Sequence, residues 1–215
     1  MKKTYNFLSL LLVAGMSFQS FAQTNPGTAN LKHQWTFDDE TAKDDIGGAD
    51  GTLTGAATIS SKALNTSAGG HLVLPAATIG VNSYVAFSQE VWFTSSAGSN
   101  GGCTMLSYFG NTTGSFGTDY VFMSPASCNR CRAAISCGNT SAPWSAENGV
   151  NRTAGAIDDG KLHQMVTILD ATSLTFYLDG VSLGSVTYTG SNAISAIGTQ
   201  FAYLCKGGYY LMLFL

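Results

Sequence analysis

Aspartates crowd one stretch near the N-terminus, where the chain carries Asp38, Asp39, Asp44, Asp45 and Asp50. Carboxylate oxygens and the backbone carbonyls of turns are the hard ligands that Ca²⁺ prefers. Asp38, Asp44 and Asp50 are therefore candidate ligands of a structural calcium ion, although their spacing does not fit an EF-hand loop. The alternative is that these aspartates are solvated turn residues with no metal.

Three aromatic residues are candidates for ligand contact, because a flat ring in a loop can stack on a sugar with polar groups beside it. Trp144, in the sequence SAPWS, is the first candidate, and Tyr108 and Tyr120 follow it. The alternative for each is an aromatic side chain that packs in the core or against a loop.

The cysteines are Cys103, Cys128, Cys131, Cys137 and Cys205. In an exported protein, cysteines form disulfides more often than they bind metal. The CxxC pair at 128 and 131 also lacks the second CxxC or nearby histidine of a zinc site. We therefore expect at least one disulfide among Cys128, Cys131 and Cys137. The odd count leaves one thiol unpaired, which we assign to Cys205.

The N-terminus has the features of an export signal. Lys2 and Lys3 precede an apolar run over residues 7–16, and the sequence SFA ends at Ala22. The run is shorter than the ~20 apolar residues that span a bilayer. Residues 1–22 are predicted to be a cleaved signal peptide, with a retained signal anchor as the alternative. We expect a secreted or cell-surface protein with no membrane span after cleavage.

Charge and composition limit the classes of partner that this protein is expected to bind. The formal net charge is −3, and it becomes −5 once Lys2 and Lys3 are removed with the signal peptide. A mildly acidic chain argues against nucleic acid and anionic lipid as partners. Because no proline-rich or charged linker divides the chain, we expect a short segment over residues 23–30 and one domain over residues 31–208.

Period-two alternation dominates the chain and predicts β-strands. Between the predicted strands lie clusters of Gly, Asn, Asp and Ser, and no stripe of helical period is convincing. This pattern is typical of an all-β sandwich or jelly roll. The strands are predicted at residues 31–37, 57–59, 71–74, 87–93, 104–109, 120–123, 133–136, 162–169, 174–178 and 181–188.

Two of these segments allow finer predictions. An Asp-Gly turn at Asp179 predicts a hairpin that pairs Leu178 with Val181 and Phe176 with Leu183. Residues 163–169 are apolar on both faces, so this strand is expected in the middle of its sheet. In the strand over 87–93, Glu90 and Trp92 share the face that is expected to meet solvent or ligand.

Five short motifs together resemble a known family. They are WTFD at 35–38, GGADGTLTG at 47–55, EVWF at 90–93, GKLHQMVT at 160–167 and FYLDG at 176–180. Their order and spacing are similar to those of laminin-G-like domains in the concanavalin A-like lectin/glucanase superfamily. The resemblance implies a two-sheet antiparallel jelly roll that binds carbohydrate or protein, with a structural calcium near the first loop.

The chain departs from the family after Leu204. The family continues with a closing strand, whereas residues 209–215 are an uncharged apolar run, YYLMLFL. We predict that the closing strand is missing through truncation or a shifted reading frame, with a buried last strand as the alternative.

The sequence also lacks the motifs of an enzyme. Glycosidases need a pair of carboxyl groups, and the ExDxxE pattern of the superfamily's glucanases is absent, as are a GxSxG elbow and a phosphate loop. We therefore expect a non-catalytic module that binds a glycan or a cell-surface protein. The alternatives are a glycoside hydrolase of the same superfamily and a purely structural interaction module.

Overall fold

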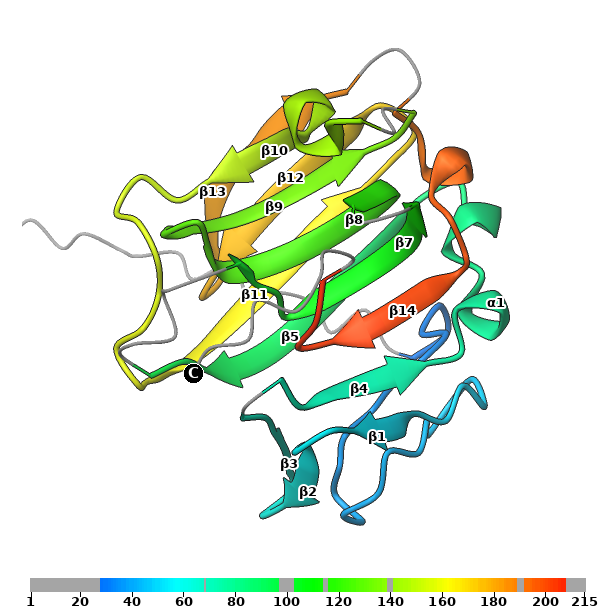
Figure 1. Ribbon diagram of the computed structural model, residues 1–215, viewed down its shortest axis with the longest axis vertical. Helices are drawn as coiled ribbons and strands as arrows, with labels where there is room; N and C mark the ends of the chain where they lie inside the picture. The colour runs from blue at the N-terminus through cyan, green and yellow to red at the C-terminus, as the bar shows by residue number, and fades with distance from the viewer. Residues whose placement is uncertain are drawn as a thin grey trace, which may run out of the picture. The chain divides into compact units, whose positions relative to one another are not determined.

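Two antiparallel sheets face each other in the unit that begins at Lys32 (Figure 1). The structure is a computed structural model that describes residues 28–67, 69–96, 103–113, 116–138, 141–188 and 192–207. Residues 28–31 belong to a separate unit, in which Leu31 N–H donates to Thr28 O at 3.1 Å. The predicted signal peptide and residues 209–215 lie outside the described residues.

The large sheet has the strand order β1-β4-β14-β7-β8-β9-β10, and β6 pairs with β8 beside this path. All of its pairs are antiparallel. Its strands are β1 (Thr52–Thr54), β4 (His71–Leu74), β6 (Cys103–Thr104), β7 (Ser107–Thr113), β8 (Phe116–Ser127), β9 (Arg130–Ser136), β10 (Asn148–Asn151) and β14 (Phe201–Leu204).

The small sheet lies behind the large one in Figure 1 and has the order β13-β12-β11-β5. Its strands are β5 (Phe87–Thr94), β11 (Leu162–Leu169), β12 (Ser173–Leu178) and β13 (Val181–Thr187). A separate hairpin and four short helical turns complete the described elements. These are β2 (Thr58–Ser60), β3 (Ala63–Asn65), α1 (Ala76–Ile79), η1 (Val81–Ser83), η3 (Pro143–Ala146) and η4 (Ile194–Ala196).

The predicted all-β antiparallel sandwich is confirmed, and so is the central place of β11 between β5 and β12. The strands predicted at 71–74 and 162–169 have the predicted bounds. The sequence missed β1, β3, β10 and β14, which have only three or four residues each. Strands this short carry too little alternation to be recognised without their neighbours.

The strand predicted over residues 31–37 does not form, and that prediction is wrong. The backbone of Gln34 is engaged by the next loop: its N–H donates to Asp44 Oδ1 at 2.9 Å, and its carbonyl accepts from Asp45 N–H at 2.8 Å. Phe37 has a φ of 59°, which breaks the extended conformation. Two of its apolar residues, Trp35 and Phe37, nevertheless pack against the main core.

The hairpin between β12 and β13 turns at Asp179 and Gly180, with φ of 51° and 76°, as a type I′ turn requires. Leu178 pairs with Val181 as predicted. The second predicted pair is wrong, since Phe176 lies opposite Gly184 and not Leu183. A bulge between Phe176 and Tyr177 shifts the register by one residue, a change that glycine tolerates at a φ of 128°.

The main core lies between the two sheets and is formed by the apolar side chains that alternate inward along the strands of both sheets. Every second residue of the small sheet points inward, among them Met165, Leu169 and Phe176, each 0% exposed. The large sheet contributes Val121 and Ile135, also 0% exposed. Within the described residues no helix is long and apolar enough to cross a membrane.

The disulfide predicted among Cys128, Cys131 and Cys137 is not formed. Cys128 lies in the turn between β8 and β9, whereas Cys131 and Cys137 both point from the β9 segment into the main core. Six residues of extended strand separate these two by ~20 Å, but a disulfide needs Cα atoms within ~7 Å. The three cysteines therefore do not lie together in one turn.

We predict that the Cys131 thiol reacts with iodoacetamide only after unfolding. It is 0% exposed, and burial raises its pKa to about 12, so the reactive thiolate is scarce in the folded protein. Mass spectrometry of protein alkylated with and without denaturant measures this directly. Recovery of Cys131 in a disulfide, or its rapid alkylation in the native protein, would contradict the prediction.

Candidate functional site

Asp44, a predicted calcium ligand, serves as the acceptor that holds the first loop together. Its side chain is 0% exposed and accepts five hydrogen bonds. Burial favours the neutral acid, yet the bonds from the backbone and from His33 hold the pKa of Asp44 well below its ordinary value. The five donors are the backbone N–H groups of Gln34, Ile46, Gly47 and Ala49 and the His33 ring at 2.6 Å.

The other two predicted ligands, Asp38 and Asp50, bond to other groups of the protein and do not converge on one point with the Asp44 side chain. Asp50 Oδ1 accepts the Asp44 backbone N–H at 2.9 Å, and Asp38 forms an exposed ion pair with Lys62 at 3.4 Å. Among the described residues, no three histidine, cysteine or acidic side chains converge as a metal site. Calcium binding at this loop stays a prediction, and both Asp44 oxygens are already used by protein donors.

We predict that Asp44→Ala lowers the free energy of unfolding by about 3 kcal/mol, because it leaves buried N–H groups without an acceptor. Asp38→Ala is the matched control and should cost less than about 0.5 kcal/mol, since its ion pair is exposed. Urea unfolding of both variants, with and without calcium, checks this. Equal losses for the two variants would contradict the structural role of Asp44, and calcium-dependent stability would support a metal.

The three aromatic residues predicted to contact a ligand differ in exposure. Tyr108 and Tyr120 are both 0% exposed, which disfavours the expected contact of their rings with a ligand. The hydroxyl of Tyr108 donates to Asn111 O, and that of Tyr120 donates to Glu147 Oε1, each at 2.7 Å. Trp144, on η3, is 49% exposed and remains accessible.

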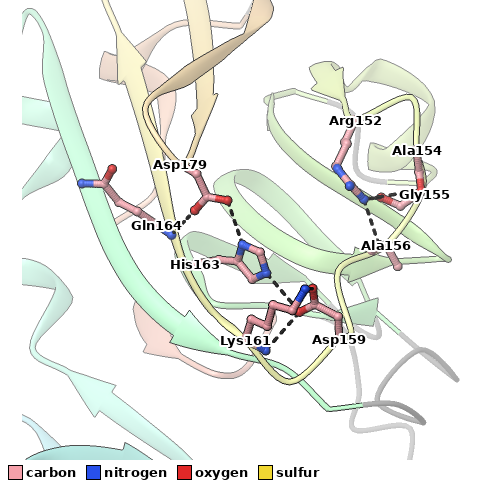
Figure 2. Close-up of polar contacts among 9 residues, drawn as sticks. All are labelled: Arg152, Ala154, Gly155, Ala156, Asp159, Lys161, His163, Gln164 and Asp179. Carbon is pink, nitrogen blue, oxygen red and sulfur yellow. Dashed lines mark hydrogen bonds and ion pairs between the residues drawn. The ribbon is translucent and has the colours of Figure 1, made fainter.

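A small polar pocket lies at the end of the small sheet, and His163 is its central side chain (Figure 2). Its Nδ1 lies 2.8 Å from Asp179 Oδ2, and its Nε2 lies 3.1 Å from Asp159 Oδ1. The hydrogen bond with Asp179, reinforced by Asp159, raises the pKa of His163. With both ring nitrogens facing carboxylates, the protonated imidazolium is the form that satisfies the site.

Arg152 closes the neighbouring loop on itself. In Figure 2 its guanidinium points into the curve of this loop, where Nη1 donates to the carbonyls of Ala154, Gly155 and Ala156 at 3.2–3.4 Å. The pocket volume of about 160 Å³ is below the ~300–1,000 Å³ typical of ligand sites. It therefore has room for a small polar group only.

Neither Asp159 nor Asp179 has the raised pKa of a glycosidase acid. The Lys161 N–H bond and His163 lower the pKa of Asp159. Burial acts to raise the pKa of Asp179, but bonds from Gln164 and His163 lower it overall. A general acid needs a raised carboxyl pKa. The described pocket therefore functions as an electrostatic clamp between β11 and the β12–β13 turn.

We predict that the clamp stabilises the protein in a defined pH window. Because the pKa of His163 is raised, this group stabilises the folded protein below about its ordinary pKa of 6.5, and that stability is lost as the pH rises through the raised pKa. Because the pKa values of Asp159 and Asp179 are lowered, these groups stabilise the folded protein above their ordinary pKa of 3.8, and that stability is lost as the pH falls. The decrease in melting temperature caused by His163→Gln should therefore be largest between about pH 3.8 and pH 6.5 and should become smaller above neutral pH. Differential scanning calorimetry across pH measures it.

His71→Gln is the control, because its effect on stability should depend on pH in the opposite direction. Burial lowers the pKa of His71, so its protonation destabilises the folded state, and its replacement should help most at low pH. A loss for His163→Gln that does not change with pH would contradict the clamp.

The outer face of the small sheet presents an exposed tryptophan. Trp92 on β5 is 60% exposed and lies opposite Gln164 on β11. Its indole N–H donates to Glu90 Oε1 at 2.7 Å, and Gln164 Nε2 donates to the same oxygen at 2.7 Å. The ring is thereby held in place while one side of it meets solvent. Glu90, Trp92, Leu162, Gln164, Val166, Ile168 and Tyr177 form this surface, the Trp92 face.

Gln164 connects the Trp92 face to the pocket. Its backbone N–H donates to Asp179 Oδ1 at 2.9 Å, while its side-chain amide points away from the pocket in Figure 2. The sequence had indicated that Glu90 and Trp92 share a solvent face, and the structure confirms it. The sequence missed Gln164 and the two aspartates around His163, because β-sheet register and loop closure bring them together.

Comparison with known proteins supports the fold. No protein-family model and no curated protein sequence matches the chain. Domain 4 of AbnA, a GH43 extracellular arabinanase from Geobacillus stearothermophilus in complex with arabinotriose, aligns with a TM-score of 0.61 and 14% identity over 84% of both chains. The chain shares this β-sandwich fold.

Two further structures differ in how far they align. The W1252A mutant of HCR D/C VPI 5995 aligns with a TM-score of 0.55 and 9% identity, over 81% of this chain and 42% of that one. Domains LG4-5 of the mouse laminin alpha1 chain align with a TM-score of only 0.44 and 19% identity, over 62% and 31%. At such low identities, the first two likenesses show a shared β-sandwich fold and nothing further.

Proposed function

We propose that this protein is a non-catalytic carbohydrate-binding module that is exported to the cell surface or beyond, and that it binds glycan on the Trp92 face. The observation that carries the proposal is the exposed Trp92 ring, fixed by Glu90 beside a neighbouring amide. Trp92 is exposed on the same outward face as Leu162 and Ile168, and apolar side chains gathered on one exposed face mark an interaction site more often than a single exposed side chain does.

The chemistry of the Trp92 face suits a neutral sugar. A pyranose or furanose ring offers C–H groups to an aromatic face and hydroxyl groups to its rim. Glu90 supplies acceptor oxygens, and the Gln164 amide supplies both donors and an acceptor within the same surface. Leu162 and Ile168, 64% and 43% exposed, extend the apolar area along β11. Arabino-oligosaccharides are a reasonable first probe, because domain 4 of the arabinanase is described with arabinotriose.

Adhesion through a protein partner is the second candidate, and the edge of β5 favours it. Among the described strands, β5 pairs with β11 on one side and with no strand on the other. An open strand edge can accept an extended peptide by main-chain hydrogen bonds. A cell-surface protein with such a segment would bind beside the Trp92 face.

We predict that Trp92→Ala weakens glycan binding by about tenfold or more, since truncation of a central aromatic anchor costs ~2 kcal/mol. Trp144→Ala is the matched control: it removes a second exposed indole, on η3, and should leave affinity nearly unchanged. A glycan array that includes arabino-oligosaccharides identifies the ligand, and isothermal titration calorimetry then compares both variants with the parent protein.

Each other outcome selects a different hypothesis. Binding lost in Trp144→Ala alone would move the site to η3. An array without hits, together with capture of a defined surface protein, would favour adhesion. Release of reducing sugar from a polysaccharide would show a hydrolase and overturn the proposal.

A further inference from the structure

The outward face of the small sheet carries almost no charge. Side chains alternate along a strand, so the burial of Met165 on β11 and of Phe176 on β12 places their sequence neighbours on the outer face. Among the outward positions of the four described strands, Glu90 is the only charged residue. The others are Ser88, Trp92 and Thr94 on β5, Leu162, Gln164, Val166 and Ile168 on β11, Ser173, Thr175 and Tyr177 on β12, and Ser182, Ser185 and Thr187 on β13.

The carboxylate of Glu90 lies at the rim of the Trp92 ring. Its Oε1 accepts the indole N–H and the Gln164 amide, each at 2.7 Å. Its Oε2 accepts no hydrogen bond from another residue that the structure describes. Along the sheet, Glu90 lies opposite Val166, and Val166 lies opposite Tyr177. A ligand that stacks on Trp92 and extends over β11 therefore lies beside the Glu90 carboxylate.

No cation of the described chain balances this carboxylate. Both donors to Glu90 are neutral, and none of the ion pairs between described residues includes it. Lys161, which precedes Leu162 at one end of the face, lies with its Nζ 3.5 Å from Asp159 Oδ2. Glu90 therefore supplies the unbalanced negative charge of the Trp92 face.

An unbalanced carboxylate distinguishes between classes of sugar. A ligand carboxylate or sulfate brought beside Glu90 is repelled, and the repulsion is stronger at a protein surface than in bulk water because the effective dielectric constant is lower. A sugar hydroxyl instead donates a hydrogen bond to Glu90, since an ionised carboxylate only accepts. A group that attracts one ligand and repels another of similar shape produces specificity.

We propose that Glu90 makes the Trp92 face selective for neutral oligosaccharides over anionic ones. The inference rests on the function proposed for this face and adds the class of glycan that it accepts. Glu90 accepts a hydrogen bond from a hydroxyl of a neutral sugar stacked on Trp92, and it repels a carboxylate, sulfate or phosphate group at the same place. Oligosaccharides of uronic acids and sulfated or sialylated glycans are thereby excluded.

Matched pairs of oligosaccharides test this selectivity. Neutral trisaccharides of arabinose, glucose and galactose are each compared with the same trisaccharide after oxidation of its primary alcohols to carboxylates. By isothermal titration calorimetry at low salt, the protein should bind the neutral member at least about fivefold more tightly. Added salt should reduce this ratio, because it screens an exposed charge. In Glu90→Gln the ratio of the two affinities should fall by about fivefold, and this ratio is the readout whatever the affinity for the neutral sugar becomes.

Glu40→Gln is the matched control, since it removes the same charge from the first loop, where Glu40 Oε1 accepts the Ser61 N–H at 3.2 Å. The ratio should not change in this variant, and an equal fall in both variants would overturn the role of Glu90. Neutral binding that is lost in Trp92→Ala, with a ratio unaffected by Glu90→Gln, would overturn the selectivity and leave the proposed function standing. Binding of no neutral trisaccharide would overturn both.

Discussion

The burial of one face of each sheet against the other is the interaction on which the remaining structure depends. In the small sheet, Met165, Leu169 and Phe176 point inward from neighbouring strands and are fully buried. Because side chains alternate along a strand, this inward set fixes which residues face outward. The exposure of Trp92 and Gln164 and the direction of the large-sheet tyrosines are both consequences of that register.

The two outer faces show that the same alternation can lead to opposite surfaces. On the small sheet the outward residues are a tryptophan, an amide, a carboxylate and scattered aliphatic side chains, and much of this surface meets water. On the large sheet the outward residues are mostly aromatic and pack on one another in a second cluster. The same alternation therefore leaves one outer face partly open to water and the other apolar and buried.

The charged residues in and beside the loops serve mainly to close these loops. Asp44 accepts five hydrogen bonds, and Arg152 donates to three carbonyls of its own loop. His163 lies between Asp159 and Asp179 and joins β11 to the hairpin turn. Groups whose lone pairs or protons are already satisfied have little capacity for a metal or a reaction, because a new ligand must replace good hydrogen bonds. This leaves the less conspicuous Trp92 face as the candidate site.

The sequence by itself determined the fold class, most of the longer strands, the Asp179 turn and the shared face of Glu90 and Trp92. These follow from local periodicity and from backbone preferences that need no distant partner. Only the tertiary structure decided that residues 31–37 form no strand, that Cys131 and Cys137 lie too far apart to bond, and that Tyr108 is buried. Each of these depends on which residues meet across the sheets and loops, and alternation along one strand cannot specify what covers either of its faces.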